Sequence, residues 1–208
     1  MTFESNGQHR SHRSGGVHKR KNGEIFVNAF QGKLAEFAVY ELLQDCDGIQ
    51  SPDLSVHPLG TWDSADLIID KFSIAVKSTK SYGNLLLLET SDWTIEAEYS
   101  NNSSELTPDF FALVRIDPDI ERLMKDDGLF FSNIIDKKTL TRIILDSKHY
   151  TYDCCGIARK SDFKIAIQNG NILPKGSMLN NATKMDAENF YIQAGDLRPI
   201  DSITEVNT

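Results

Sequence analysis

The sequence predicts an α/β fold, and three observations lead to this prediction. A helical pattern covers about residues 24 to 44, an alternating apolar and polar pattern covers Asp66 to Lys77, and two strongly apolar segments follow at 84–89 and 109–116. A period near 3.6 residues is typical of helices, and a period of two is typical of strands with one buried face. A helix followed by several strands therefore predicts a domain that contains both kinds of element.

The first predicted helix has apolar residues on most of its sides. Phe30, Leu34 and Phe37 form one apolar face at ~100° per residue, and further apolar residues cover much of the rest. A carboxylate inside such a helix needs a reason, because a buried carboxylate is costly unless it is paired or binds a metal. Glu36 and Glu41 are both candidates for such a role.

The segment from Asp66 to Lys77 predicts a short β-hairpin with chemistry on one face. The residues expected to face the core are Leu67, Ile69, Ile74 and Val76. If Lys71 and Phe72 form a two-residue loop, Asp66 lies opposite Lys77 and Ile68 lies opposite Ala75, with Cβ atoms about 5 Å apart. A carboxylate and an ammonium group would then share the other face of the hairpin.

The later elements follow from shorter patterns. Residues 84–89 predict a third core strand, and the nearly apolar segment 109–116 predicts a central fourth strand. Residues 128–136 predict another strand, and residues 137–145 predict either a helix or a strand. Ser161 and Asp162 favour a helix start for 161–168, and residues 189–192 predict a final strand.

Asp66 and the later Ala75-Val76-Lys77 resemble the signature of the PD-(D/E)XK nuclease superfamily. In that family, an Asp near the end of one strand and an acid two residues before a Lys on the next strand hold a divalent metal. Ala75 occupies the acid position here and cannot bind a cation through its side chain. Some members take a carboxylate from an upstream helix instead, and the segment that starts at Gly32 resembles the family's first core helix with its Glu at Glu36.

Two other carboxylates remain candidates for the missing acid. Glu41 lies nearer the centre of the apolar helix face, and Glu89 lies at the end of the third predicted strand. We favour Glu36, because its place in the Gly-x-x-x-Glu segment matches the resemblance.

The resemblance implies a mixed central β-sheet flanked by helices, in a restriction-endonuclease-like core, and Mg²⁺-dependent hydrolysis of DNA. Mg²⁺ prefers oxygen ligands and keeps several waters, so Asp66, Glu36 and the Val76 carbonyl would suffice to hold it. Lys77 would orient the attacking water and stabilise the developing negative charge. A type II-like restriction endonuclease is the expected member, because the chain carries no ATPase motif.

Three other interpretations stay open. Asp66 and Lys77 could form an ordinary cross-strand ion pair on a solvated face. The chain could be a catalytically inactive nuclease-fold protein that binds nucleic acid or a protein partner, with Ala75 as a sign of lost activity. It could also be an interaction module with no nucleic-acid role, which its acidic composition would suit.

Length and composition set the broad class. The chain has 208 residues, of which 40% are hydrophobic, and this is enough for one domain with an elaboration. No apolar run approaches ~18 residues and the start of the chain is polar, so we expect no membrane association and a cytoplasmic location. The three cysteines, Cys46, Cys154 and Cys155, form no disulfide or zinc pattern, and we expect them to be reduced and structural.

Charge is distributed unevenly along the chain, although its net value is −8. Residues 1–22 predict a basic flexible arm, residues 23–147 the nuclease-like core, and residues 148–208 a small C-terminal α+β extension for recognition or dimerisation. The arm could follow a phosphate backbone or be a solubilising tail. The predicted DNA-contacting residues are Arg10, Arg13, Lys19, Arg20, Lys21 and Lys80. Further possible phosphate contacts in the extension are Lys160, Lys164, Lys175, Lys184 and Arg198.

The expected partner is double-stranded DNA. Cleavage of both strands at a palindromic site requires a two-fold symmetric enzyme, so a homodimer is predicted.

Overall fold

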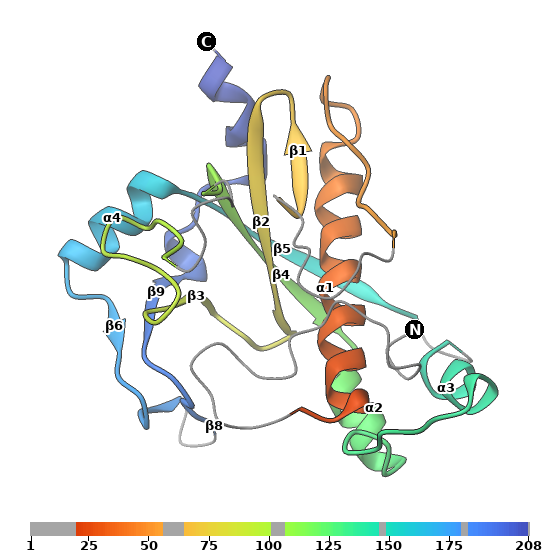
Figure 1. Ribbon diagram of the computed structural model, residues 1–208. Helices are drawn as coiled ribbons and strands as arrows, with labels where there is room; N and C mark the ends of the chain where they lie inside the picture. The colour runs from red at the N-terminus through yellow and green to blue at the C-terminus, as the bar shows by residue number, and fades with distance from the viewer. Residues whose placement is uncertain (1–19, 56–64, 101–106, 146–148, 180–182, 208) are drawn as a thin grey trace.

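A computed structural model describes residues 20–55, 65–100, 107–145, 149–179 and 183–207 of the chain. A central mixed β-sheet is flanked by helices on one face and by a second, smaller sheet with a helix on the other (Figure 1). This confirms the predicted α/β class with a mixed sheet.

The first helix, α1 (Asn22–Leu43), is present where the sequence predicts it. It lies along the core sheet and contacts β2 (Phe72–Lys80), β4 (Phe110–Asp117) and β5 (Thr151–Arg159). Its buried side chains include Ala35, Ala38 and Val39. Small and β-branched side chains at these positions let the helix approach the sheet closely.

The core sheet has the strand order β1-β2-β4-β5, where β1 is Leu67–Ile69. β1 pairs antiparallel with β2, β2 pairs parallel with β4, and β4 pairs antiparallel with β5. The predicted fourth strand, now β4, is central and nearly fully buried, as its apolar sequence indicates. The segment assigned by sequence to a C-terminal extension supplies β5 to this sheet.

The predicted hairpin forms, but its register differs by two residues from the prediction. Leu67 pairs with Ile74 and Ile69 pairs with Phe72, so the turn residues are Asp70 and Lys71. Asp70 has a φ of 53°, a conformation that Asp tolerates better than most residues. Because the shift is an even number, the same side chains still share a face, and only the partner across the hairpin changes.

A second sheet lies on the opposite side of the core sheet from α1. It consists of β3 (Leu85–Glu89), β9 (Asn189–Gln193) and β6 (Ile172–Leu173) in the order β3-β9-β6. The prediction that 84–89 is a third strand of the core sheet is therefore wrong, because β3 pairs with β9 instead. A short hairpin, β7 (Met178–Leu179) and β8 (Thr183–Lys184), lies between β6 and β9 in the sequence.

The remaining described elements are helical. They are α2 (Ile120–Asp126), α3 (Lys137–Ile144), α4 (Lys160–Gln168), η1 (Ala194–Asp196) and η2 (Ile200–Asn207). The segment 137–145, left open by the sequence, is thus a helix, and α4 matches the predicted helix at 161–168. Asp119 and Asp136 cap α2 and α3 by accepting hydrogen bonds from the Arg122 and Thr139 N–H groups.

The strand predicted at 128–136 is absent, and this segment has an irregular backbone. It packs against the start of α1, where the Gly23 N–H donates to the Ser132 carbonyl at 2.9 Å. A Cβ atom at Gly23 would lie 2.2 Å from the Leu129 carbonyl oxygen, so the close approach requires glycine. The apolar side chains that favoured a strand instead pack irregularly into the core, as Phe130 does.

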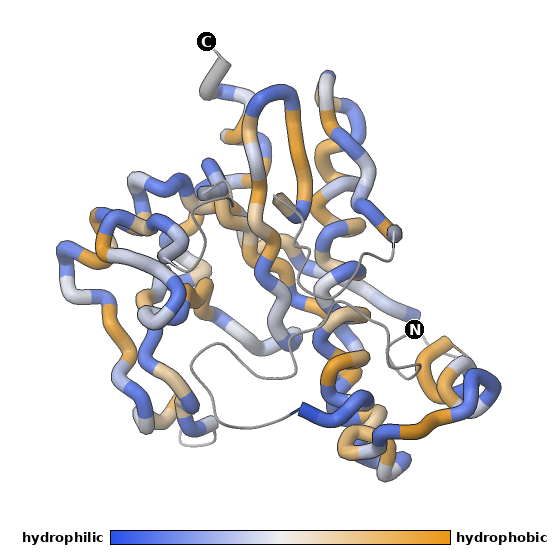
Figure 2. Tube along the Cα trace, viewed as in Figure 1, coloured by the Kyte–Doolittle hydropathy of each residue, from blue (hydrophilic) through white to orange (hydrophobic). Residues whose placement is uncertain are grey.

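Two apolar clusters lie on the two faces of the core sheet. One joins α1, α2 and α3 to residues such as Ile74 and Val76, and the other joins α4 and the second sheet to residues such as Ala75 and Phe111. Figure 2 shows hydrophobic segments along the strands and a hydrophilic turn at the tip of the β1–β2 hairpin. The alternation along β2 therefore decides which side chains face α1 and which face the second sheet.

Two smaller predictions can also be compared with the structure. The three cysteines are free, and burial raises the pKa of both Cys154 and Cys155, which favours the protonated thiol. No helix within the described ranges is both long and apolar enough to cross a membrane.

Candidate active site

The base of the β1–β2 hairpin brings Asp66 close to β2. The Asp66 carboxylate accepts a hydrogen bond from the Val76 N–H, with 2.7 Å between the nitrogen and Oδ2. Continuing the observed register by one residue places Asp66 opposite Ala75, and not opposite Lys77 as predicted. The predicted direct pairing of the Asp66 carboxylate with the Lys77 ammonium across the hairpin is therefore wrong in register.

The Val76 backbone contributes a second oxygen at the same edge of β2. A strand residue that pairs with a neighbouring strand directs its N–H and C=O to the same side. Because the Val76 N–H is bonded to Asp66, the Val76 carbonyl is directed toward the same edge. A carboxylate oxygen and a carbonyl oxygen therefore lie on one side of the strand, which matches in kind the ligands that a hard cation prefers.

Lys77 is the residue of β2 that follows Val76, and its side chain lies on the same face of the sheet as Ala75. It is half-buried, and its register partner in the parallel strand β4 is Leu113. Among the described residues, the Lys77 ammonium makes no hydrogen bond or ion pair. A half-buried ammonium without a carboxylate partner favours the binding of an anion.

Ala75, at the position of the acid in the family signature, packs in the hydrophobic core. It is only 7% exposed and belongs to the apolar cluster with Phe111 and Leu113. A carboxylate at this position would be buried among apolar side chains, at a cost of several kcal/mol unless it bound a cation (about 2–7 kcal/mol even for a neutral polar group). The structure therefore explains the alanine by packing.

Glu36 and Glu41 lie on different sides of α1. Glu36 is buried at 7% exposure and pairs with Lys33 at 2.6 Å, whereas Glu41 is exposed. Burial and a hydrogen bond to Glu41 raise the pKa of Tyr152 in β5, so Glu41 is directed toward the β5 edge of the sheet. Five residues separate the two glutamates, which turns Glu36 about 140° away from that direction.

The β1 edge of the sheet lies opposite the β5 edge, and the base of the hairpin belongs to it. The N-terminal half of α1 contacts β2 through Gln31, whose amide donates a hydrogen bond to the Ser78 hydroxyl at 3.3 Å. Of the two helix carboxylates, Glu36 is therefore the buried one that faces away from β5. The third candidate, Glu89, lies at the end of β3 in the second sheet, opposite Asn189.

The predicted DNA-contacting residues are only partly described. Arg10, Arg13 and Lys19 lie outside the described residues, and Arg20 and Lys21 directly precede α1. Lys80 forms ion pairs with Asp119 at 3.0 Å and with Glu121 at 3.2 Å. Two carboxylates next to this ammonium oppose a phosphate contact.

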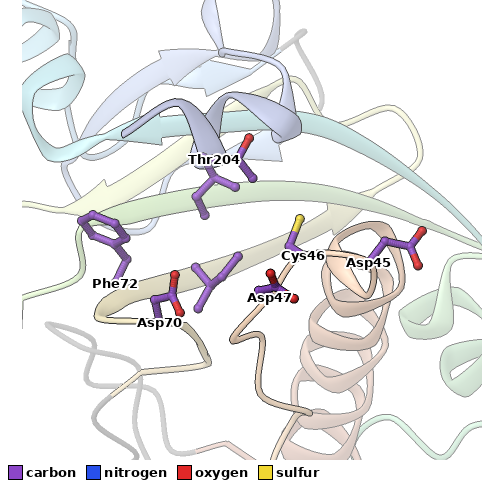
Figure 3. A pocket seen from close by; sticks show the side chains of 8 residues that line it. Asp45, Cys46, Asp47, Asp70, Phe72 and Thr204 are labelled. Atoms are coloured by element: carbon purple, nitrogen blue, oxygen red, sulfur yellow. The ribbon is translucent and has the colours of Figure 1, made fainter. Parts of the chain in front are cut away.

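A pocket of about 390 Å³ lies at the other end of the hairpin (Figure 3). It is lined by Asp45, Cys46, Asp47, Ile69, Asp70, Phe72, Ile203 and Thr204. The sequence signal for this place is the run Asp45-Cys46-Asp47, which begins two residues after the end of α1. Within the described ranges, no group of three or more His, Cys, Asp or Glu side chains is arranged to hold a metal ion.

Comparisons with known proteins returned no match for this chain, whether made with protein-family models, with curated proteins or with solved structures.

Proposed function

We propose that the protein is a Mg²⁺-dependent DNA endonuclease of the PD-(D/E)XK type, with a restriction-like activity on double-stranded DNA. The observation that carries the proposal is the hydrogen bond from the Val76 N–H to Asp66, with Lys77 as the next residue of β2. It holds Asp66 against the part of β2 that carries Ala75, Val76 and Lys77. The order of helix, hairpin and further strands supports the same proposal.

The residues assigned to the proposed site suit the chemistry of phosphodiester hydrolysis. Asp66, the Val76 carbonyl and Glu36 would hold Mg²⁺, which supplies charge neutralisation and an activated water when bound. Lys77 would orient that water and stabilise the negative charge that develops on the phosphate. Ala75 takes no part in the chemistry and fills space in the apolar cluster.

Incubation of the protein with plasmid and phage DNA tests this proposal. We expect discrete fragments with Mg²⁺, none with EDTA, and none with the Lys77→Ala variant. Cleavage by the Lys77→Ala variant at the wild-type rate would contradict the site assignment. Cleavage of both strands at a symmetric sequence further predicts a homodimer, which the solution mass would reveal.

A second candidate function is favoured by Ala75. Its place in the apolar cluster suits a protein that has kept the fold and lost catalysis, and that binds nucleic acid or a protein partner. Such a protein would bind DNA equally well with and without divalent metal. Substitution of Asp66 would leave that binding unchanged.

A further inference from the structure

The Glu36 carboxylate is one of two buried charges in the described part of the chain. Glu36 is 7% exposed, and the other buried charged residue is Asp92, in the segment after β3. A carboxylate that leaves water needs a cation or hydrogen-bond donors to compensate for its lost hydration. A metal ion that binds Glu36 therefore meets the group that already compensates its charge.

Lys33 supplies a cation to Glu36 from the previous turn of α1. The Lys33 Nζ atom lies 2.6 Å from Glu36 Oε2. Residues three apart are neighbours on a helix surface, so this contact needs no other element of the fold. The Lys33 side chain is 36% exposed, whereas the Glu36 side chain is 9% exposed. The pair thus joins an ammonium group at the surface to a carboxylate in the interior.

The surroundings of Lys33 leave room for its ammonium group to move away. A Cβ atom added at the preceding residue, Gly32, would meet no other atom within 4 Å. Within the described ranges, Lys33 has no second ion pair that would hold it in place. Lysine carries its charge on a flexible four-carbon stem. The ammonium group can therefore turn into solvent while the backbone of α1 stays where it is.

The Lys33 ammonium and a magnesium ion would repel each other at this carboxylate. Mg²⁺ binds oxygen ligands at about 2.0–2.1 Å, so a magnesium ion on Glu36 Oε2 would lie at most about 5 Å from the ammonium nitrogen. Two cations at that distance repel strongly where little water separates them. Metal binding at Glu36 therefore requires Lys33 to leave, and breaking the Lys33–Glu36 pair weakens the binding.

We propose that Lys33 competes with Mg²⁺ for the Glu36 carboxylate and so lowers the affinity of the site for the metal ion. The inference rests on the proposed function, which assigns Glu36 to the metal. Lys33 compensates the buried carboxylate when no metal is bound, and it turns toward solvent when Mg²⁺ binds. In this role Lys33 is a positioning residue, and it is neither a metal ligand nor a catalytic residue.

Thermal unfolding of the full chain in a series of Mg²⁺ concentrations, without DNA, tests this inference. A ligand that binds the folded protein raises its melting temperature by an amount that grows with its affinity. The test variant is Lys33→Met, which removes the ammonium group and keeps an apolar stem. Its matched control is Lys125→Met, because Lys125 also pairs with a glutamate of its own helix, Glu121. The control removes the same charge outside the proposed metal site.

Lys33→Met should bind Mg²⁺ about twofold to tenfold more tightly than the wild type, because the metal ion no longer displaces an ammonium group. Without Mg²⁺ it should melt at a lower temperature, because the buried Glu36 carboxylate has lost a cation. A lysine with only a structural role would lower the stability without raising the metal affinity. Lys125→Met and Lys33→Arg should both bind Mg²⁺ with the wild-type affinity.

The variant Glu36→Gln makes the test specific to the pair. Glu36→Gln alone should weaken Mg²⁺ binding, because it removes a charged ligand. Adding Lys33→Met to Glu36→Gln should change the affinity no further, since the competition takes place at Glu36. This comparison separates competition at Glu36 from a general effect of lost positive charge.

The outcomes separate this inference from the proposed function. If Lys33→Met binds Mg²⁺ more tightly and Glu36→Gln removes the difference while no DNA is cut, the inference holds and the nuclease proposal fails. If the wild type cuts DNA but Lys33→Met has the wild-type affinity for Mg²⁺ or a lower one, the inference is wrong and the nuclease proposal stands. If Mg²⁺ stabilises neither the wild type nor Lys33→Met, the inference is also wrong.

Discussion

The two ends of the β1–β2 hairpin both carry carboxylates, but they differ in what surrounds them. At the base, the Asp66 carboxylate accepts a backbone N–H and lies beside a strand that presents Lys77. At the turn, Asp45, Asp47 and Asp70 line a pocket that no lysine or arginine lines. A phosphodiester is an anion, so the acidic pocket would repel it, whereas the proposed site at the base of the hairpin includes the ammonium group of Lys77.

The pocket and the residues of the proposed site therefore lie at opposite ends of the hairpin. The pocket at the turn is a concave feature of the described residues, and a pocket is the usual first hypothesis for a binding site. The residues of the proposed nuclease site belong instead to the base of the hairpin and to α1. Variants at the two ends should therefore behave differently.

The largest expected effect is the loss of hydrolysis on substitution at the base. Lys77→Ala and Asp66→Asn should each lower the rate of Mg²⁺-dependent cleavage by at least about 100-fold to 1,000-fold, because each removes a group that stabilises the transition state or holds the metal. Initial rates on plasmid DNA measure this. The matched variants Asp47→Asn and Asp70→Asn, at exposed positions of the turn end, should cut at the wild-type rate. The reverse pattern would place the site at the turn.

A second comparison concerns the two glutamates of α1. Glu36→Gln should lower the cleavage rate by about tenfold or more, as expected for a group that holds or orients a metal. Glu41→Gln should leave the rate unchanged, because Glu41 is exposed and hydrogen-bonded toward β5. Thermal unfolding of both variants checks the fold. Equal rates for the two variants would show that Glu36 is not the replacement acid.

The rigidity of the turn end can be tested at Gly48. Gly48 has a φ of 80°, and a Cβ atom there would lie 2.2 Å from Asp70 Oδ1 and 3.0 Å from the Asp70 nitrogen. Gly170 has a φ of 79° with open space around it. Gly170→Ala should cost about 1–2 kcal/mol from the backbone conformation alone, and Gly48→Ala should cost about 1 kcal/mol more. Denaturant unfolding measures both values, and equal losses would mean that Asp70 moves aside freely.

The smallest expected effect separates Lys77 from Lys80 on the same strand. Burial alone would lower the pKa of Lys80, but its hydrogen bonds to Asp119 and Glu121 and their charges raise it above 10.5. A raised pKa in the folded state means that these pairs stabilise the protein below pH 10.5 and stop doing so as the pH rises through the folded pKa. Lys80→Met should therefore cost no more than about 1 kcal/mol at neutral pH.

The pH dependence provides the check on this last prediction. The difference in unfolding free energy between the wild type and Lys80→Met should shrink when the pH is raised from neutral to above 10.5. DNA affinity at neutral pH should be the same for both proteins, because the Lys80 charge is already balanced by Asp119 and Glu121. A large loss of affinity would show that Lys80 leaves its carboxylates to contact phosphate.

Local patterns were sufficient to predict several elements. The helix α1, the central strand β4, the helix α4 and the last strand β9 lie within one or two residues of their predicted positions. Each has a clear period or a recognisable helix start, and such signals depend on near neighbours in the chain. The strand prediction for 128–136 was wrong because it depended on apolar composition alone. The apolar side chains of this segment pack into the core without a regular backbone.

Pairing between distant segments was not predictable. β3 has the alternation of a strand, but nothing in its sequence indicates that its partner is β9 rather than a strand of the core sheet. The two-residue shift of the hairpin arises at the turn, where Asp70 adopts a positive φ. This conformation is most common at Gly and Asn, so the sequence offers no clear sign that the turn begins at Asp70.

The sequence by itself determined which residues share a face. Because side chains alternate along a strand, Asp66, Ala75 and Lys77 stay on one side of the hairpin under any even shift of register. Only the tertiary structure decided that Asp66 bonds the Val76 N–H, that Glu36 is the buried helix carboxylate, and that Lys80 is paired while Lys77 and Lys175 have no carboxylate partner among the described residues. Alternation is a local property of the backbone, whereas burial and ion pairing depend on segments that meet only when the chain has folded.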